Sequence, residues 1–494
     1  MEPQRNLKRP RLPSERSSTS HAFPLNDLPD KSGQGNPDAY DRALRFLYDR
    51  IDYERMSTSN AVRYRFRLQR MIDLLTGLGL QQFLYRPDAA PEKLLVHVAG
   101  TKGKGSVATM VAAMLSASGL KTGLYTSPHL HRLEERFRVD GKPCSPAELI
   151  GLVDQLRAMT GEDKGETGRP SFFEMTTAMA LLHFERTSCE AIVLEVGLGG
   201  RLDSTNVCSP SLSVITSIGL DHQHVLGDTL VQIAREKAGI IKQHVPVISG
   251  VADADAADVI RSQAGQHQCE MFQLGIDFDF DHQPAERWGS KVLYRGLRSP
   301  LTQRLQVDLP LEGAHQARNA TLAIAVTDLL RERGTGITRD AVHSGLASLS
   351  CEGRIERFDL PGDVLGIVDS AHNEDSINAL CDCLQTRSSN RKVCVVFGTS
   401  LDKSAEPMLN SLAKVADRIL LTRFHGNPRF RDPHELEPLL PAAMREREIV
   451  IEDPIEACQR GQQLASPGGT LVICGSFFLA AETRSWMRQQ AETI

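Results

Sequence analysis

The sequence predicts an α/β protein with two domains, a large one built on a parallel-rich sheet and a smaller one of the same class. Three observations predict this fold. Residues 94–126 read as a strand, a glycine-rich loop, a helix and a second strand, and such a βαβ unit implies parallel pairing. Apolar strands and helices then alternate to about residue 250. The alternation begins again after residue 350.

The first elements follow from hydrophobic spacing. Apolar residues recur at helical intervals within residues 38–80, which predicts two helices. The strand at 94–99 should lead into a helix at about 106–118, with Gly119 as its C-terminal cap. Residues 121–126 should form the next strand.

The rest of the large domain continues this pattern. The sequence SFFE at 171–174 has the form of a capping box, so a helix should run from there to about residue 186. Residues 275–312 are aromatic, polar and turn-rich, and they predict an antiparallel excursion. The other expected elements are strands at 191–196, 211–218 and 245–250, and helices at 229–241 and 314–331.

The second α/β domain should begin near residues 351–357. Its helices are expected at 375–385 and 455–464, and its strands at 365–370, 392–398, 418–424, 448–453 and 469–475. We therefore divide the chain into a disordered tail (1–36), an ATPase-like domain (37–350) and a C-terminal domain (351–494). The tail contains KRPR, for which nuclear import is an alternative interpretation to simple disorder.

Composition excludes several classes of function. The chain has 494 residues and a net charge of −5. It therefore lacks the overall basic excess that favours binding to nucleic acid. No run of about 18 apolar residues predicts a membrane span. Its 10 cysteines include no CxxC motif, which favours reduced thiols in the cytoplasm. We expect a cytoplasmic monomer.

The glycine-rich loop GTKGKGS predicts an anion site. Gly100, Gly103 and Gly105 let an anion approach the backbone closely, and the N-terminus of the next helix favours negative charge. Lys104 adds a positive charge. The loop departs from the standard GxxxxGK[ST] pattern, because Val98 stands five residues before Gly103. A tight strand-to-helix turn without a ligand is the alternative.

Polar residues follow three other strands, at the edge where doubly wound sheets bind ligands. Glu195 could hold Mg²⁺ beside phosphates, or it could form a structural salt bridge. Asp221 and His222 follow another strand, and a role in capping the loop explains them equally well. Asp369, His372 and Asn373 lie where a strand gives way to a helix, and they could orient a substrate or cap that helix.

Together these stretches resemble the folylpolyglutamate synthase and dihydrofolate synthase family of the Mur ligase superfamily. The resemblance covers about residues 40–480. The matching motifs, in chain order, are HVAGTKGKGS, YTSPHL, ERFRVDG, FFEMTTAMA, LEVGLGGRLDSTNV, LDHQHVLG, REKAGI, HQARNA and DSAHN.

The resemblance implies an N-terminal Mur-ligase-type P-loop ATPase domain and a C-terminal Rossmann-like domain. It also implies a reaction in which a folate carboxylate attacks the γ-phosphate of ATP. The amine of L-glutamate then displaces phosphate from the acyl phosphate. The implied small molecules are ATP, L-glutamate, and a folate or dihydropteroate, with two Mg²⁺ sites.

The resemblance also assigns residues to these ligands. Lys237 matches a lysine that CO₂ converts to a carbamate in relatives, and the catalytic set is Lys104, Lys237, Asp369 and His372. The resemblance implies that ATP is bound by Gly100, Thr101, Gly103, Lys104, Gly105, Ser106, Asn319 and Arg354. It implies that Mg²⁺ is bound by Ser127, Glu195, His222 and Lys237. It implies that Phe173 and Asp203 bind the pterin and that Ser476 binds glutamate.

The acceptor stays open at this point. Lys102 is typical of monofunctional folylpolyglutamate synthases, whereas GGRLDSTN resembles the bifunctional bacterial type. Ser370, Glu374 and Ser404 stand where relatives carry Gly, Pro and Asp. Besides a folate ligase, with or without dihydrofolate synthase activity, the alternatives are a Mur-type ligase with another acceptor and a nucleotide-binding regulator without catalysis.

Overall fold

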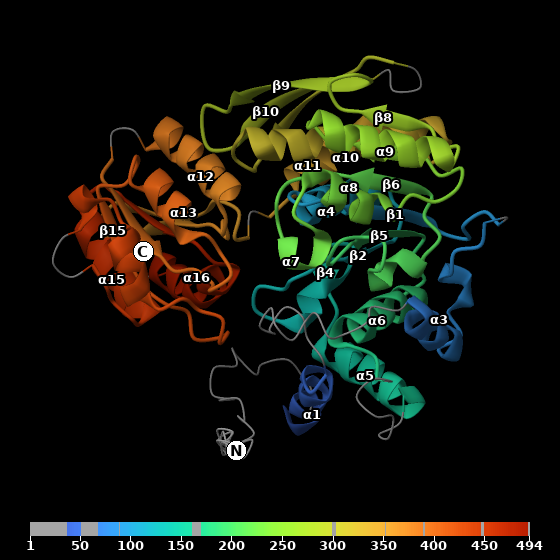
Figure 1. Ribbon diagram of the computed structural model, residues 1–494, viewed down its shortest axis with the longest axis horizontal. Coiled ribbons are helices and arrows are strands. Elements are labelled where there is room, and N and C mark those ends of the chain that lie inside the picture. Colours follow the sequence, from blue (N-terminus) through green and yellow to red (C-terminus); the bar gives the residue numbers. More distant parts are fainter. Residues whose placement is uncertain are drawn as a thin grey trace, which may run out of the picture.

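The computed structural model has two lobes, with the N-terminal part of the chain in one and the C-terminal part in the other (Figure 1). It describes residues 37–50, 68–87, 89–160, 169–298, 303–350, 352–388, 391–445 and 449–492. The predicted tail, residues 1–36, lies outside the described residues. The mixed α/β class with a large and a smaller sheet is confirmed.

The large lobe is built on an eight-stranded sheet in the order β4-β3-β2-β5-β1-β6-β7-β8. Pairing is parallel from β2 to β8, while β3 and β4 add antiparallel pairs at one edge. The strands are β1 (Leu94–Ala99), β2 (Thr122–Tyr125), β3 (Phe137–Val139), β4 (Lys142–Pro143), β5 (Ala191–Glu195), β6 (Leu212–Ile215), β7 (Val247–Ser249) and β8 (Met271–Gln273).

Helices cover both faces of this sheet, as its apolar strands predict. Leu95 belongs to the core cluster under one set of helices, while its neighbour Val96 belongs to the cluster on the other face. The first set is α1 (Pro37–Tyr48), α3 (Leu68–Gly77), α5 (Pro146–Thr160) and α6 (Phe172–Arg186). The second is α4 (Lys104–Ala117), α10 (Ala314–Glu332) and α11 (Arg339–Ala347). Near β7, α8 (Leu230–Ala238) packs on α9 (Ala254–Gln266), and α7 (Gln223–Leu226) precedes them.

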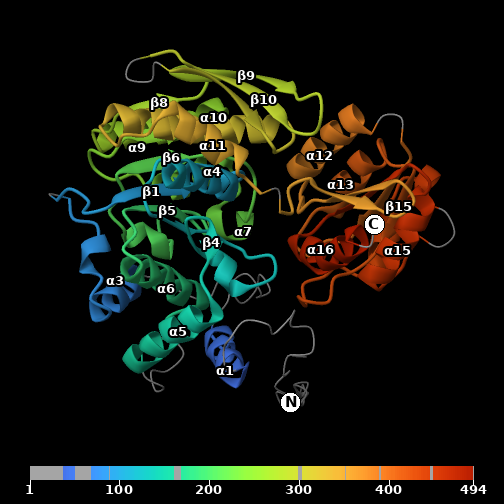
Figure 2. The same ribbon diagram turned by 180° about the vertical axis from the view of Figure 1, so that it is seen from behind.

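The predicted antiparallel excursion is a three-stranded sheet in the order β11-β10-β9. Its strands are β9 (Phe278–Pro284), β10 (Ser290–Gly296) and β11 (Arg304–Leu309). Val292 and Tyr294 of β10 are fully buried in the cluster that contains α10. The hairpin of β9 and β10 extends over α10 and reaches toward α12 of the other lobe (Figures 1 and 2).

The smaller lobe has a five-stranded sheet in the order β12-β13-β16-β14-β15, parallel except for β12. Its strands are β12 (Glu356–Leu360), β13 (Val364–Val368), β14 (Val393–Phe397), β15 (Arg418–Leu421) and β16 (Thr470–Cys474). Its helices are α12 (Glu374–Arg387), α13 (Ala405–Leu412), α14 (Pro433–Leu436), α15 (Pro454–Ala465) and α16 (Phe477–Ala491).

Several predicted elements are shorter in the structure, such as β6, and two further differences concern the segment at 448–453 and the helix after the glycine loop. The strand expected at 448–453 was wrong, because the described residues there form only an isolated bridge, between Leu421 and Val450. The helix after the glycine loop begins at Lys104 rather than at residue 106, so the loop is shorter than predicted. The capping box at Ser171 is confirmed: its hydroxyl accepts a hydrogen bond from the backbone N–H of Glu174.

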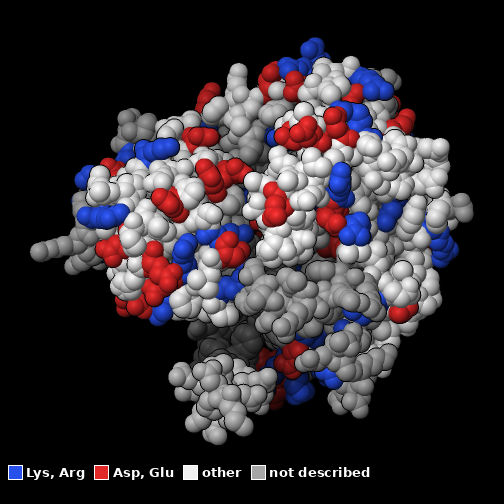
Figure 3. All heavy atoms as spheres, viewed as in Figure 1, with Lys and Arg blue, Asp and Glu red and all other residues white. Residues whose placement is uncertain are grey.

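Two features of the described residues concern partners. None of their helices has the length and apolar character that a membrane crossing requires. Acidic and basic side chains are interspersed over the face shown in Figure 3. This face therefore has no extended basic field of the kind that binds nucleic acid.

Candidate active site

A cavity of about 1430 Å³ is lined by residues of both lobes, and it contains the predicted site. Every predicted site residue except Gly100 and Lys237 lines it. The cavity brings the phosphate loop of the large lobe to face Asp369, His372 and Ser476 of the small lobe. Residues that lie more than 200 positions apart in the sequence thus share one space.

The phosphate loop joins β1 to the first turn of α4. Gly103 has φ of 82°, and a Cβ at this position would overlap the side chain of Asn319 from α10. The ammonium of Lys104 folds back over the loop and donates to the backbone oxygen of Gly100 at 3.0 Å. The loop therefore presents backbone N–H groups, a helix N-terminus and a positive charge at one place, which suits a polyphosphate.

The loop is held by the segment that follows β6. The backbone N–H of Thr101 donates to Ser217 O at 2.8 Å, and that of Lys102 donates to Ser217 Oγ at 2.9 Å. The hydroxyl of Thr216 donates to Lys102 O at 2.6 Å, and the N–H of Gly219 donates to Thr101 Oγ1 at 3.0 Å. Residues 216–221 and the phosphate loop are therefore expected to move together.

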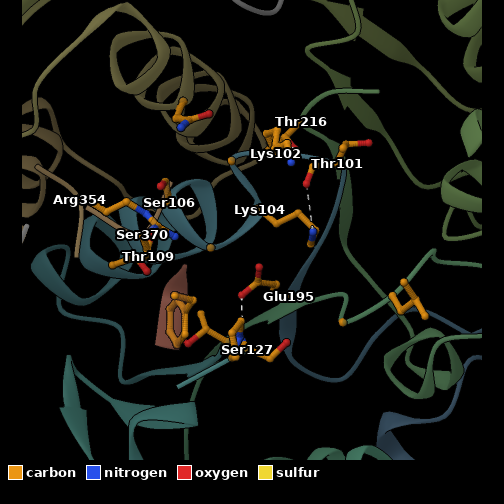
Figure 4. Close-up of a pocket in the computed structure, with 18 of the residues that line it drawn as sticks. Thr101, Lys102, Lys104, Ser106, Thr109, Ser127, Glu195, Thr216, Arg354 and Ser370 are labelled. Carbon is orange, nitrogen blue, oxygen red and sulfur yellow. Dashed lines mark hydrogen bonds between the residues drawn. The ribbon is translucent and has the colours of Figure 1, made fainter. Parts of the chain in front are cut away.

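Glu195 ends β5 and lies beside the phosphate loop. Figure 4 shows Lys104, Glu195 and Ser127 around the same space. The backbone N–H of Ser127 donates to Glu195 Oε2 at 3.0 Å, and a Cβ at Gly105 would lie 3.3 Å from the same oxygen. Burial raises the pKa of the Glu195 carboxyl to about 7, although Lys104 and the Ser127 N–H lower it.

This arrangement fits a divalent cation next to phosphates. Glu195 is 4% exposed, and its second oxygen has no hydrogen bond to any described residue. A buried carboxylate with a free oxygen is a ligand that Mg²⁺ prefers. The described residues contain no group of three or more His, Cys, Asp or Glu side chains suited to a metal. Most ligands of such an ion would therefore come from phosphates, hydroxyls or water.

Asp221 and His222 follow β6, as predicted, but they have different surroundings. The Asp221 carboxylate forms two ion pairs. Its oxygens lie 3.2 Å from Nζ of Lys102 and 3.4 Å from Nζ of Lys403, which belongs to the small lobe. Burial favours a raised pKa for the Asp221 carboxyl, but Lys102, His222 and Lys403 outweigh it and hold this pKa well below its usual range. The His222 side chain is 44% exposed, and the backbone of this residue has a φ of 48°.

Lys237 lies in α8 and is 4% exposed. Burial, together with repulsion from Lys104, lowers the pKa of its amine to about 7. No described residue accepts a hydrogen bond from its Nζ. A buried, partly neutral amine is the nucleophilic form that reacts with CO₂. Although Lys237 does not line the cavity, its neighbour Glu236 does.

The small lobe supplies a polar cluster at the end of β13. The Asp369 carboxylate accepts the backbone N–H groups of Ile355 at 2.8 Å and Ala371 at 2.7 Å, and burial raises its pKa. The guanidinium of Arg354 donates to the hydroxyl of Ser370. Asp369 thus holds the chain between the lobes, which places Arg354 at the cavity.

His372 is oriented by its own backbone. Its Nδ1 lies 2.8 Å from Ser370 O, and because a carbonyl only accepts, Nδ1 carries the hydrogen. Burial and the positive charges of Lys102 and Lys403 lower the pKa of His372 to about 4. The ring is therefore neutral near pH 7, and its Nε2 has a lone pair.

Phe173, Asp203 and Ser476 are held by local contacts. The Phe173 ring lies 5.8 Å from that of Tyr125, and it fills the space that a Cβ at Gly197 would need. Both Asp203 oxygens accept hydrogen bonds from their own loop, including those from Gly197 N at 3.1 Å and Leu198 N at 3.0 Å. Ser476 caps α16 by accepting the N–H of Phe478 at 3.1 Å.

Two of the cavity residues that the sequence did not predict, Lys403 and His315, are close to predicted ones. Lys403 faces Asp221 across the lobes, and only its neighbour Ser404 was noted, for its departure from relatives. His315 lies on α10 one turn before Asn319 and lines the cavity. Its spacing of four residues from Asn319 was a usable signal, because i and i+4 share a helix face.

Comparison with known proteins gives consistent results. The model of the Mur ligase middle domain matches residues 98–327, and that of the Mur ligase glutamate ligase domain matches residues 353–477. The chain is 33% identical over 424 residues to the dihydrofolate synthase/folylpolyglutamate synthase of Bacillus subtilis, covering 83% of this chain and 95% of that protein.

Solved structures agree with this. The folylpolyglutamate synthase of Thermotoga maritima is 31% identical, with a TM-score of 0.76 over 91% of this chain and 97% of that chain. The Mycobacterium tuberculosis enzyme, solved with ADP and AMPPCP, is 29% identical with a TM-score of 0.77 over 91% and 98% of the two chains. The chain therefore belongs to the folylpolyglutamate synthase and dihydrofolate synthase family of the Mur ligase superfamily.

Proposed function

We propose that this protein joins L-glutamate to the γ-carboxyl of a folate, such as tetrahydrofolate or folylpolyglutamate, and converts ATP to ADP and phosphate. The observation that carries this proposal is the single cavity in which a phosphate loop faces a polar cluster from the second lobe. A carboxylate is a poor electrophile, and transfer of the γ-phosphoryl group to it supplies a leaving group. The glutamate amine then attacks the acyl phosphate.

The phosphate loop residues neutralise the charge of the first step. The backbone N–H groups from Gly103 to Ser106 and the ammonium of Lys104 bind the phosphates of ATP, with Gly100 and Thr101 shaping the loop. Two negatively charged reactants meet here, so stabilising the developing charge is the main task of the site. Asn319 and Arg354 bind the nucleotide from α10 and from the connection between the lobes.

Mg²⁺ fits beside this loop. Glu195, Ser127 and His222 would hold it, with Lys237 contributing to a second site. The bound ion supplies positive charge that offsets the phosphate oxygens. For Lys237 we propose carbamylation: the neutral amine attacks CO₂ and loses a proton, which gives an anionic oxygen ligand in place of a buried ammonium.

The small lobe serves the second step. The Nε2 lone pair of His372 can accept a hydrogen bond from the glutamate ammonium and orient it, because Nδ1–H is engaged by Ser370 O. Ser476 and the N-terminus of α16 suit a glutamate carboxylate. Asp369 fixes the strand end that carries His372. On the large lobe, Phe173 and the loop held by Asp203 would receive the pterin.

Dihydropteroate as an additional acceptor is a second candidate, because relatives of both kinds are similar to this chain. The dihydrofolate synthetase of Saccharomyces cerevisiae is 30% identical over 84% of this chain. A structure of Escherichia coli FolC with DHPP and ADP has a TM-score of 0.74. We also propose that the protein is a cytoplasmic monomer, which cell fractionation and light scattering test.

A panel of acceptors tests the proposal. Purified protein with ATP, Mg²⁺ and L-glutamate should release ADP only when an acceptor is present, and omission of glutamate should stop net turnover. The panel contains tetrahydrofolate, dihydrofolate, dihydropteroate and a peptidoglycan precursor. Turnover only with the precursor would identify a Mur-type ligase with another acceptor. ATP binding without turnover on any acceptor would indicate a non-catalytic regulator.

A further inference from the structure

Asp221, in the large lobe, pairs with one lysine of its own lobe and one lysine of the small lobe. Its Oδ2 lies 3.2 Å from Nζ of Lys102, on the phosphate loop, and its Oδ1 lies 3.4 Å from Nζ of Lys403, which follows β14 in the small lobe. Each carboxylate oxygen therefore holds one ammonium. We call Lys102, Asp221 and Lys403 the lysine bridge. All three residues line the cavity.

Each end of the lysine bridge is fixed to its own lobe. Asp221 belongs to the segment 216–221, whose hydrogen bonds hold the phosphate loop. Lys403 is also 3.4 Å from Asp402, whose other oxygen lies 2.7 Å from Arg429. The backbone N–H of Leu401 donates to Arg429 O at 2.9 Å, so these contacts hold the Lys403 segment to its own lobe. A shift of the small lobe would thus carry the Lys403 ammonium away from the phosphate loop.

A second contact between the lobes has a different character. The guanidinium of Arg387, on α12, lies 2.9 Å from Glu312 and donates to the backbone oxygens of Ala285 at 2.9 Å and Gly289 at 3.1 Å. Its charge also lies 5.5 Å from the centre of the Trp288 ring. Arg387 and Glu312 are 13% and 6% exposed, so this contact is nearly dry.

The lysine bridge is more exposed to solvent than the Arg387 contact, and it consists of ion pairs alone. The side chains of Lys102, Asp221 and Lys403 are 32%, 18% and 16% exposed. The apolar residues beside it, Leu220 and Leu401, are 57% and 59% exposed, so they do not seal it. Partly solvated ion pairs are individually weak and are screened by salt. The bridge can therefore open while the Arg387 contact keeps the lobes attached.

We propose that Asp221 is a positioning residue that brings the Lys403 ammonium to the phosphate loop, so that the cations facing the transferred phosphoryl group are complete only when the lobes are together. This inference deepens the proposed function and rests on it. Lys102, Lys403 and Arg429 outnumber Asp221 and Asp402, so the assembled group has net positive charge. An anionic phosphoryl group is the chemistry that such an excess favours.

The test is a double-mutant cycle on the full chain. Asp221→Asn and Lys403→Met should each lower kcat by about 10- to 100-fold, because small misplacements of a charge at the reacting centre have effects of this size. The KM for the folate acceptor should stay unchanged, since the contacts that hold Phe173 and the Asp203 loop do not involve the lysine bridge. The double variant should match the worse single variant within about threefold, because both changes break one interaction.

Matched variants separate positioning from a structural role. Lys403→Arg keeps a cation opposite Asp221 and should restore most of the rate. Lys414→Met removes an exposed lysine of the same lobe and should leave kcat unchanged. Additive losses in the double variant, wild-type kcat in either single variant, or an arginine variant as slow as the methionine variant would overturn the proposal.

A measurement without turnover distinguishes this inference from the proposed function. Small-angle scattering of the substrate-free protein should give a larger radius of gyration for Asp221→Asn and Lys403→Met than for the wild type. High salt should likewise increase the radius of gyration of the wild type. Equal radii would overturn the bridge even if the wild-type enzyme is active. Absent turnover in the wild type would refute the proposed function, while the scattering result would still decide the bridge.

Discussion

Replacement of Lys237 by methionine should make the protein more stable at neutral pH. The amine has a pKa of about 7 in the folded protein against 10.5 for an ordinary lysine. Between these values the unfolded chain holds a proton that the folded chain has lost, so stability rises as the pH rises through this window. In this range, burial of Lys237 therefore costs most near pH 7 and least near pH 10.5.

The pKa shift sets the size of the effect. The cost of keeping Lys237 is up to about 4 kcal/mol at pH 7.5 and about 1 kcal/mol at pH 9.5. Lys237→Met, which fills a similar volume without a charge, removes this cost. The variant should therefore gain more stability at pH 7.5 than at pH 9.5, although it should lose turnover.

Thermal unfolding in CO₂-free buffer measures this. The rise in Tm of Lys237→Met over the wild type should be clearly larger at pH 7.5 than at pH 9.5. Lys121→Met removes an exposed lysine and should change Tm little at either pH. Adding bicarbonate should stabilise the wild type and leave Lys237→Met unaffected. An equal rise in Tm at both pH values would refute the argument from burial.

Three further predictions concern the phosphate loop and the tail. Lys104→Ala should lower kcat on the order of 10²- to 10³-fold with unchanged circular dichroism; near-normal kcat would contradict its role. Gly103→Ala should raise the KM for ATP at least about tenfold, because φ is 82° and the methyl group would meet Asn319; an unchanged KM would mean that the nucleotide binds elsewhere. Deletion of residues 1–36 should leave kcat/KM within about twofold of the full chain, and a large loss would show that the catalytic unit needs the tail.

Local signals in the sequence predicted most of the fold. The capping box at Ser171 and the glycine at residue 119 gave correct helix ends because their effects are confined to one turn. The strand expected at 448–453 failed for the opposite reason. Its run of apolar residues, 449–451, is genuine. However, only Val450 pairs, with Leu421, and pairing is set by the neighbouring strand rather than by the segment itself.

The candidate site was predicted in its parts but not in its connections. The phosphate loop could be read from its glycines. The two partners of Asp221 could not, because Lys102 and Lys403 are 119 and 182 residues away and only the folded chain brings them together. Similarly, only the resemblance assigned Asp203 to the pterin, and the sequence could not show that its own loop engages both carboxylate oxygens.

The contact between Arg387 and the β9–β10 hairpin has a consequence for dissecting the protein. Trp288 belongs to the large lobe by sequence, yet its ring packs against the hydrophobic core of the small lobe. A fragment that stops before the small lobe would leave this indole and the Glu312 carboxylate without their cover. Separately produced halves should therefore be less soluble than the intact polypeptide, and co-expression of both fragments should recover soluble material.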